Sequence, residues 1–146
     1  MALGLSLIFG SGAVVAAPTC LPQFQQGWIR AAPPGTTALA AYGRLRNTCP
    51  KAFVLKDVAS KDFAMAMVHE TRVEKGVSQM RAADELSIPA RGQLDFAPGG
   101  RHIMLMHPVR ELKVGDKVWL EITLAGGTRI RARFEVRREA PAATKR

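Results

Sequence analysis

The sequence predicts an all-β protein, a sandwich or a barrel, because short segments of alternating apolar and polar residues recur about every ten residues. Turn-forming residues separate these segments, for example the run Ala97-Pro98-Gly99-Gly100. No stretch has the period of about 3.6 residues that marks an amphipathic helix. Seven to eight strands are therefore expected, connected by short loops.

The first half of the predicted domain contains four such segments. Leu39, Ala41 and Leu45 share one parity, which is the pattern of a strand with one buried face. The turn Lys75-Gly76 separates a longer apolar segment from a short one. The strands expected in this half are 38–47, 53–58, 64–73 and 77–81.

The second half ends in the clearest element, a hairpin across Gly126-Gly127. Val118 and Leu120 alternate with polar residues in its first strand. In its second strand, apolar residues such as Phe134 alternate with arginines, so that one face is buried and the other is charged. The strands expected in this half are 93–96, 101–106, 117–124 and 128–137.

The length of 146 residues favours a single domain with its own core. Residues 2–17 carry no charge and end in the small-residue run that precedes a signal cleavage site, although the usual basic start is missing. This stretch is also short for a membrane span. The expected organisation is a signal peptide at 1–16, an N-terminal extension at 17–37, a β-sandwich domain at 38–137 and a disordered tail at 138–146.

The formal net charge of +9 suits an acidic partner or an anionic surface, and a merely solvated basic face is the simpler interpretation. Nucleic acid is less favoured, because aromatic residues make up only 6% of the chain and do not interleave with the basic ones. Neither a nucleophile beside a base nor a pair of carboxylates stands out, so an enzyme is not expected.

The two cysteines, Cys20 and Cys49, do not form a Cys-x-x-Cys pair. In an exported chain two such cysteines usually form a disulfide, and the loop closed here is worth about 3–4 kcal/mol of chain entropy. A pair of thiolate metal ligands or a redox pair is the alternative.

Histidine and methionine are concentrated in two short segments, 65–69 and 102–107. Residues i and i+2 of a strand project from one face about 6.5–7 Å apart, so His102 and Met104 are able to approach one metal ion. His69 and Met80 complete a set of four ligands if their strands lie alongside. Thioethers combined with imidazole select copper(I). A methionine in a strand is, however, more often a core residue than a ligand, and the two clusters alone leave both interpretations open.

The spacing His69-x10-Met80-x21-His102-x-Met104 resembles the metal-binding signature of the periplasmic copper chaperone family PCuAC, at every ligand and in every gap. The flanking residues are also similar, from Pro98 to Met106 and from Leu112 to Asp116. There are two departures. Glu70 follows the first histidine where many members have methionine, and the C-terminal tail lacks the histidines and methionines that bind copper(II) in some members.

This resemblance implies a cupredoxin-like Greek-key β-sandwich that carries one copper(I) ion, without catalysis, in the periplasm. It also implies delivery of copper to cytochrome c oxidase assembly, particularly to the copper A centre, with a thiol-bearing assembly factor as partner. A monomer with no nucleic-acid partner and no stable membrane span is expected. The remaining candidates are assigned elsewhere: Met65, Met67 and Met106 to packing, His107 to a surface turn, and Trp28 and Trp119 to packing.

The main alternative is a noncatalytic exported β-sandwich module that binds an acidic partner through its basic surface, with the histidines and methionines incidental. A blue-copper electron carrier is a third interpretation. It is disfavoured because such a centre needs a cysteine thiolate beside two histidines, and both cysteines lie towards the N-terminus.

Overall fold

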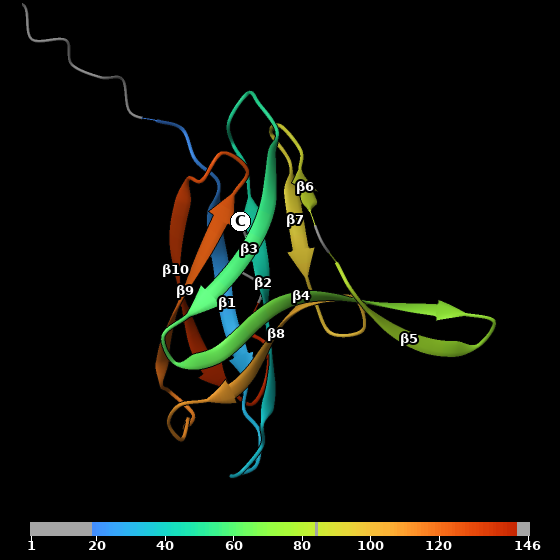
Figure 1. Ribbon diagram of the computed structural model, residues 1–146, viewed down its shortest axis with the longest axis vertical. Coiled ribbons are helices and arrows are strands. Elements are labelled where there is room, and N and C mark those ends of the chain that lie inside the picture. Colours follow the sequence, from blue (N-terminus) through green and yellow to red (C-terminus); the bar gives the residue numbers. More distant parts are fainter. Residues whose placement is uncertain (1–18, 84, 143–146) are drawn as a thin grey trace, which may run out of the picture.

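The computed structural model describes residues 19–83 and 85–142, which form ten β-strands and no helix (Figure 1). The predicted all-β class is confirmed. Within these ranges no helix is long and apolar enough to cross a bilayer. The strands are Gln23–Arg30 (β1), Ala38–Arg46 (β2), Phe53–Ser60 (β3), Phe63–Glu74 (β4), Val77–Ala82 (β5), Leu86–Ile88 (β6), Gln93–Phe96 (β7), Arg101–Pro108 (β8), Lys117–Leu124 (β9) and Arg129–Arg137 (β10).

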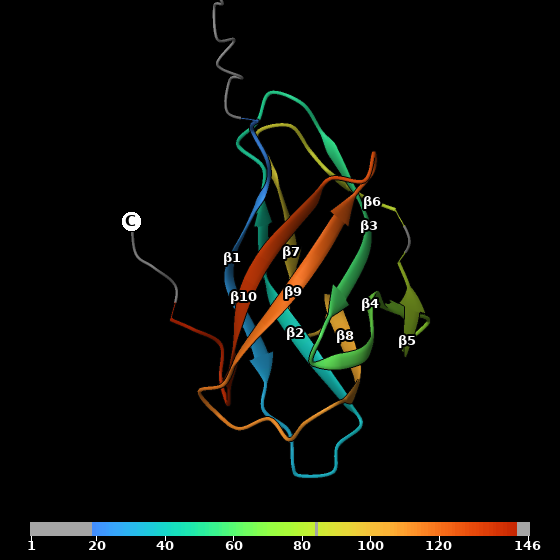
Figure 2. The ribbon, with the colours of Figure 1, turned by 60° about the vertical axis from the view of Figure 1, so that its left-hand side comes forward.

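The strands form one hydrogen-bonded path in the order β5-β4-β8-β2-β1-β10-β9-β3-β6, and β7 pairs with the second half of β2. The path folds back on itself, so that β3 and β9 face β2 across the interior (Figures 1 and 2). All pairs are antiparallel except β1 with β10. The result is a sandwich whose two layers are joined by continuous pairing.

Alternation along the strands builds the core. In the β9–β10 hairpin, Val118, Leu120 and Phe134 are fully buried, while the arginines of β10 point outward. Glycines 126 and 127 close this hairpin with positive φ angles, as the sequence predicts. The same alternation buries apolar side chains of β2, β3, β4, β7 and β8 against this hairpin.

The N-terminal boundary of the domain requires correction, because β1 lies inside the segment 17–37 that the sequence assigns to an extension. β1 is hydrogen-bonded to β2 on one side and to β10 on the other, and its Ile29 is fully buried. The strand was missed because a bulge between Gln25 and Trp28 breaks its alternation. β6 was also missed, since a strand of three residues carries no periodic signal.

The termini add two observations. The expected signal peptide at 1–16 lies outside the described residues. Residues 138–142 follow β10 without regular structure, and Ala140 and Pro141 line a shallow pocket beside Trp28. Disorder of the tail stays a prediction.

The predicted disulfide between Cys20 and Cys49 is present. It ties the segment before β1 to the loop between β2 and β3. In that loop the buried amide of Asn47 donates hydrogen bonds to the carbonyl oxygens of Lys51 and Pro89, each at 2.8 Å, and accepts one from the Cys49 N–H at 3.0 Å. The cross-link therefore ends in a rigid loop.

One feature departs from a compact sandwich. The second half of β4 and all of β5 form a hairpin that projects from the body (Figure 1). Every residue of β5 is exposed, and Val73 near the tip is 71% exposed. The first half of β4 packs on the body through Phe63 and Val68.

The close approach of β1 and β2 at Gly43 gives a test of this fold. Gly43 has a φ of +143°, and a Cβ there would lie 2.4 Å from Phe24 Cε1 and 2.9 Å from the carbonyl oxygen of Gln25. We expect Gly43→Ala to lower the free energy of unfolding by about 2–4 kcal/mol, because it adds overpacking to backbone strain. Urea denaturation followed by tryptophan fluorescence measures the loss.

The control is Gly35→Ala, where φ is +81° but nothing lies within 4 Å of the added Cβ. It should cost only the backbone term, about 1–2 kcal/mol. Equal losses in the two variants would contradict the packing of β1 against β2.

Candidate metal centre

The pairing of β4 with β8 sets histidines and methionines directly opposite one another. In an antiparallel ladder, opposite residues point to the same face with Cβ atoms about 4.5–5.5 Å apart. Val68 and Ile103 face each other across the same ladder one residue away and are buried in the core. The histidines and methionines therefore occupy the outer face. The opposite pairs are His69 with His102, Met67 with Met104, and Met65 with Met106.

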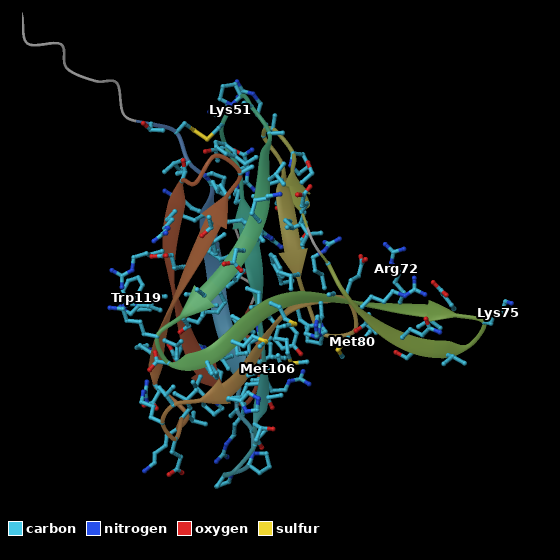
Figure 3. The ribbon with its side chains drawn as sticks, viewed as in Figure 1. Lys51, Arg72, Lys75, Met80, Met106 and Trp119 are labelled. Atoms are coloured by element: carbon cyan, nitrogen blue, oxygen red, sulfur yellow. A yellow bond between two sulfur atoms is a disulfide. The ribbon has the colours of Figure 1, made fainter. Side chains whose placement is uncertain are left out.

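Met80 reaches the same face from the projecting hairpin. It lies opposite Thr71 in the β4–β5 ladder, and Thr71 shares the face of His69, two residues away. Met80 is thus the diagonal neighbour of His69, at the base of the hairpin (Figure 3), and is 53% exposed. The four predicted ligands His69, Met80, His102 and Met104 share one face of three adjacent strands.

His102 is held in one orientation. The residue is 6% exposed, and its Nδ1 lies 3.2 Å from the carbonyl oxygen of Gly100. A carbonyl oxygen only accepts, so Nδ1 carries the hydrogen and donates it. The lone pair is then on Nε2, the atom left for a metal ion, as in many metal-binding histidines.

His69 lies against His102, with ring centroids 5.9 Å apart and ring planes at 88°. Its Nδ1 is buried and has no hydrogen-bond partner in the described part of the chain, and its Nε2 lies 3.0 Å from the sulfur of Met67. Burial of the ring lowers the pKa of His69 below its ordinary 6.5, and the charge of His102 lowers it further. His69 is therefore mainly neutral at neutral pH, and its ring keeps a nitrogen lone pair that no hydrogen bond uses.

Aromatic side chains lie beside His102 on the same outer face. Tyr42 of β2 lies 6.3 Å from the His102 ring, centroid to centroid, and Trp28 of β1 lies 4.9 Å from Tyr42. The guanidinium of Arg30 lies over both Trp28 and Tyr42. Sequence reasoning missed Tyr42. The sequence signal that could have found it is strand parity, because Tyr42 is a large aromatic residue on the face of strand 38–47 opposite to Leu39 and Ala41.

The structure sorts the other candidate residues. Met65 is 48% exposed, so its assignment to the core is wrong, and Met67 is half-buried in contact with His69. His107 is exposed as predicted, but it lies in β8 and not in a turn, and its backbone N–H donates to the carbonyl oxygen of Thr37 at 2.7 Å. Trp119 was expected to pack but is 48% exposed beneath Arg131.

The donor set favours a soft metal ion. Across residues 19–83 and 85–142, no group of three or more histidine, cysteine, aspartate or glutamate side chains is arranged to hold a metal ion. A site on this face must therefore use thioethers. Glu70, next to His69, points to the other face and pairs with Arg72 and Arg101.

Comparison with known proteins identifies the family. The family model described as "Putative lipoprotein LpqE-like" matches residues 23–136. The chain belongs to the LpqE-like family. A relative from Leifsonia xyli subsp. xyli, "Putative lipoprotein Lxx21020", is 33% identical over 107 residues, which are 73% of this chain. This LpqE-like chain spans 63% of the length of that relative.

Solved structures share the fold. Apo-DR1885 from Deinococcus radiodurans is 27% identical with a TM-score of 0.65, over 95% of each chain. CuI-DR1885 is 28% identical with a TM-score of 0.64, over 86% of this chain and 83% of that one. The copper-bound PCuAC domain from PmoF2, 23% identical over 81% of this chain and 92% of its own, has a TM-score of 0.64 and supports the fold alone. The cupredoxin-like sandwich and the resemblance to PCuAC are confirmed for this LpqE-like chain, and the ligand set stays a prediction.

The lowered pKa of His69 is testable in the metal-free protein. We expect a pKa below 6.5 in the folded protein. Because the unfolded chain then binds a proton more readily than the folded one, the free energy of unfolding should decrease as the pH falls below the pKa of the free side chain. His102→Gln should raise the pKa of His69, because it removes the electrostatic effect of His102 that lowers it. NMR titration of the ring protons from about pH 4 to pH 9 measures both values.

His107→Gln is the matched control, since His107 is an exposed histidine near the end of β8, and it should leave the pKa of His69 unchanged. A pKa of 6.5 or higher for His69, or no response to His102→Gln, would refute this account of the site.

Proposed function

We propose that this LpqE-like protein is a copper(I)-binding metallochaperone whose ligands are His69, Met80, His102 and Met104. The observation that carries the proposal is the β4–β8 register, in which His69 faces His102 on the outer face of the sheet, with Met104 next along β8. The similarity to CuI-DR1885, at 28% identity, supports the choice of metal.

Ligand chemistry supports copper(I) over other cations. Two imidazoles and two thioethers form a neutral, soft set that suits copper(I) and binds magnesium or calcium poorly. Thiolates do not contribute, because Cys20 and Cys49 are joined in the disulfide. The same fact argues against a blue-copper centre, which needs a thiolate ligand.

The exposure of the site supports a carrier rather than an enzyme. Met80, on the projecting hairpin, is 53% exposed, so an acceptor has access to the bound ion from that side. Neutral thioethers need no proton to leave a metal ion, and an incoming thiolate displaces them one at a time. The metal ion is cargo in this proposal, and no catalytic role is assigned.

Export and delivery belong to the same proposal. We assign the protein to the periplasm, and its acceptor to cytochrome c oxidase assembly at the copper A centre, with a thiol-bearing factor as partner. The disulfide and the lipoprotein names of the family and of the Leifsonia relative support export. The sulfur of Cys20 is in the disulfide and is not free to carry a lipid.

The alternative of a basic binding surface has weaker support. The arginines of β10 lie on its outer face, but Arg129 pairs with Glu121, and Arg137 pairs with Glu135. These carboxylates offset part of the positive charge there, and exposed ion pairs of this kind contribute little affinity or stability.

Copper(I) titration under reducing conditions tests the ligand set. We expect one tightly bound equivalent, and a fall in affinity of at least about 100-fold in both His102→Gln and Met104→Leu, since loss of a ligand exceeds the 10- to 100-fold typical of residues that only orient ligands. Competition with a chromogenic copper(I) chelator measures the affinity. His107→Gln should bind as the wild type does, and unchanged affinity in both ligand variants would show the site to be wrongly assigned.

Transfer is tested with an acceptor. A peptide carrying two cysteines should remove copper(I) from the loaded protein, and Met80→Leu should accelerate the transfer, because one exposed ligand is already lost. Stopped-flow absorbance of the copper–thiolate product measures the rate. A Val77→Ala variant, changed on the same hairpin, controls for disturbance of β5, and transfer no faster in Met80→Leu than in this control would contradict a role for Met80.

A further inference from the structure

Three methionines on the face of the proposed site are not used by it. Met65 and Met106 are directly opposite in the β4–β8 ladder, and Met67 lies on the same face two residues from Met65. Together with Met104, opposite Met67, they form a two-by-two block of thioethers. Figure 3 shows Met106 on β8, farther from the hairpin than Met80.

These methionines are not explained by the core. Val68, Ile103 and Leu105 fill the inner face of the same strands and are 5% exposed or less, whereas Met65 is 48% exposed and Met67 and Met106 are half-buried on the outer face. Packing in the core therefore does not explain a large apolar side chain at the exposed position of Met65. A thioether at the surface remains available as a ligand.

The positions of the three methionines allow them to reach one ion. Opposite Cβ atoms are about 4.5–5.5 Å apart and diagonal ones are at most about 7–8 Å apart, and methionine has three torsions with which to aim its sulfur. On the β2 side, Ala38 and Ala40 are the residues opposite Met106 and Met104. Their methyl groups leave space over the block and supply no oxygen or charge, so hard cations find no ligand there.

We propose that Met65, Met67 and Met106 form a second, weaker site for a soft monovalent cation, copper(I) or its analogue silver(I), contiguous with the first site. The inference rests on the proposed function in one respect: it takes the neighbouring residues to hold the tightly bound ion. Three neutral thioethers without an imidazole give a site that binds soft ions alone and releases them readily.

The link between the two sites is Met67. Its sulfur lies 3.0 Å from Nε2 of His69, so an ion held by Met67 is next to a ligand of the first site. An ion captured at the exposed Met65 passes to His69 by exchange of one ligand for another. The ion remains monovalent throughout, and no proton or electron is transferred, because thioethers and neutral imidazole bind without deprotonation.

The experiment is a silver(I) titration of the full chain carrying ¹³C-methyl methionine, followed by NMR of the methyl signals. The first equivalent should shift Met80 and Met104, and the second should shift Met65, Met67 and Met106. In Met65→Leu/Met106→Leu the second equivalent should be lost, while the affinity for the first changes less than about 3-fold, because leucine keeps the volume but offers no sulfur.

Met80→Leu is the matched control, since it makes the same replacement on the same face but removes a ligand of the first site. It should lower the affinity for the first equivalent. The second equivalent should still shift the methyl signals of Met65, Met67 and Met106. Retention of the second equivalent in Met65→Leu/Met106→Leu, or its absence from the wild type, would overturn the inference. Failure of the proposed function would give a different result. The affinity for the first equivalent would then be unchanged in His102→Gln, while the thioether block would still bind silver(I).

Discussion

The candidate site depends on the register between β4 and β8. Side chains alternate between faces along a strand, so a slip of one residue would turn every ligand of one strand into the core. The core prevents that slip. Val68 and Ile103 are opposite each other and buried on the inner face, and their pairing places His69 opposite His102 on the outer face. Hydrophobic packing, rather than a metal ion, thus holds the two histidines together. An ion that binds there would pay a smaller entropy cost for ordering the side chains.

A second constraint comes from β1, which flanks the site on the far side of β2. Its Trp28 packs on Tyr42, and Tyr42 lies against His102, so a strand more than 70 positions earlier in the sequence helps to position this proposed ligand. The disulfide between Cys20 and Cys49 secures the start of β1 to the loop after β2. Oxidising conditions therefore stabilise the part of the sandwich that fixes His102, without a cysteine touching the site.

The sequence was sufficient for the features that depend on local periodicity. Alternation predicted seven to eight strands and the parity shared by His102 and Met104, and the residues themselves predicted the Gly126-Gly127 turn. It was insufficient where the signal is non-local or interrupted. A bulge concealed β1, and the opposition of Met65 to Met106 depends on a register that only tertiary pairing defines. The exposure of Met65 was mispredicted for a related reason. Parity shows which residues share a face of the strand, but it does not show which face is buried.

The four proposed ligands differ in how firmly the fold holds them. His102 and Met104 lie on β8, which is hydrogen-bonded to β4 on one side and to β2 on the other, whereas Met80 lies on β5, an edge strand bonded on one side only. Every residue of β5 is exposed, so opening of this strand costs little compared with opening of β8. An ion in the proposed site would therefore lose Met80 first and stay attached to the body through the two histidines. In the proposed function, the least firmly held ligand would leave first when an acceptor engages the hairpin, while the ligands on the body keep the ion bound until then.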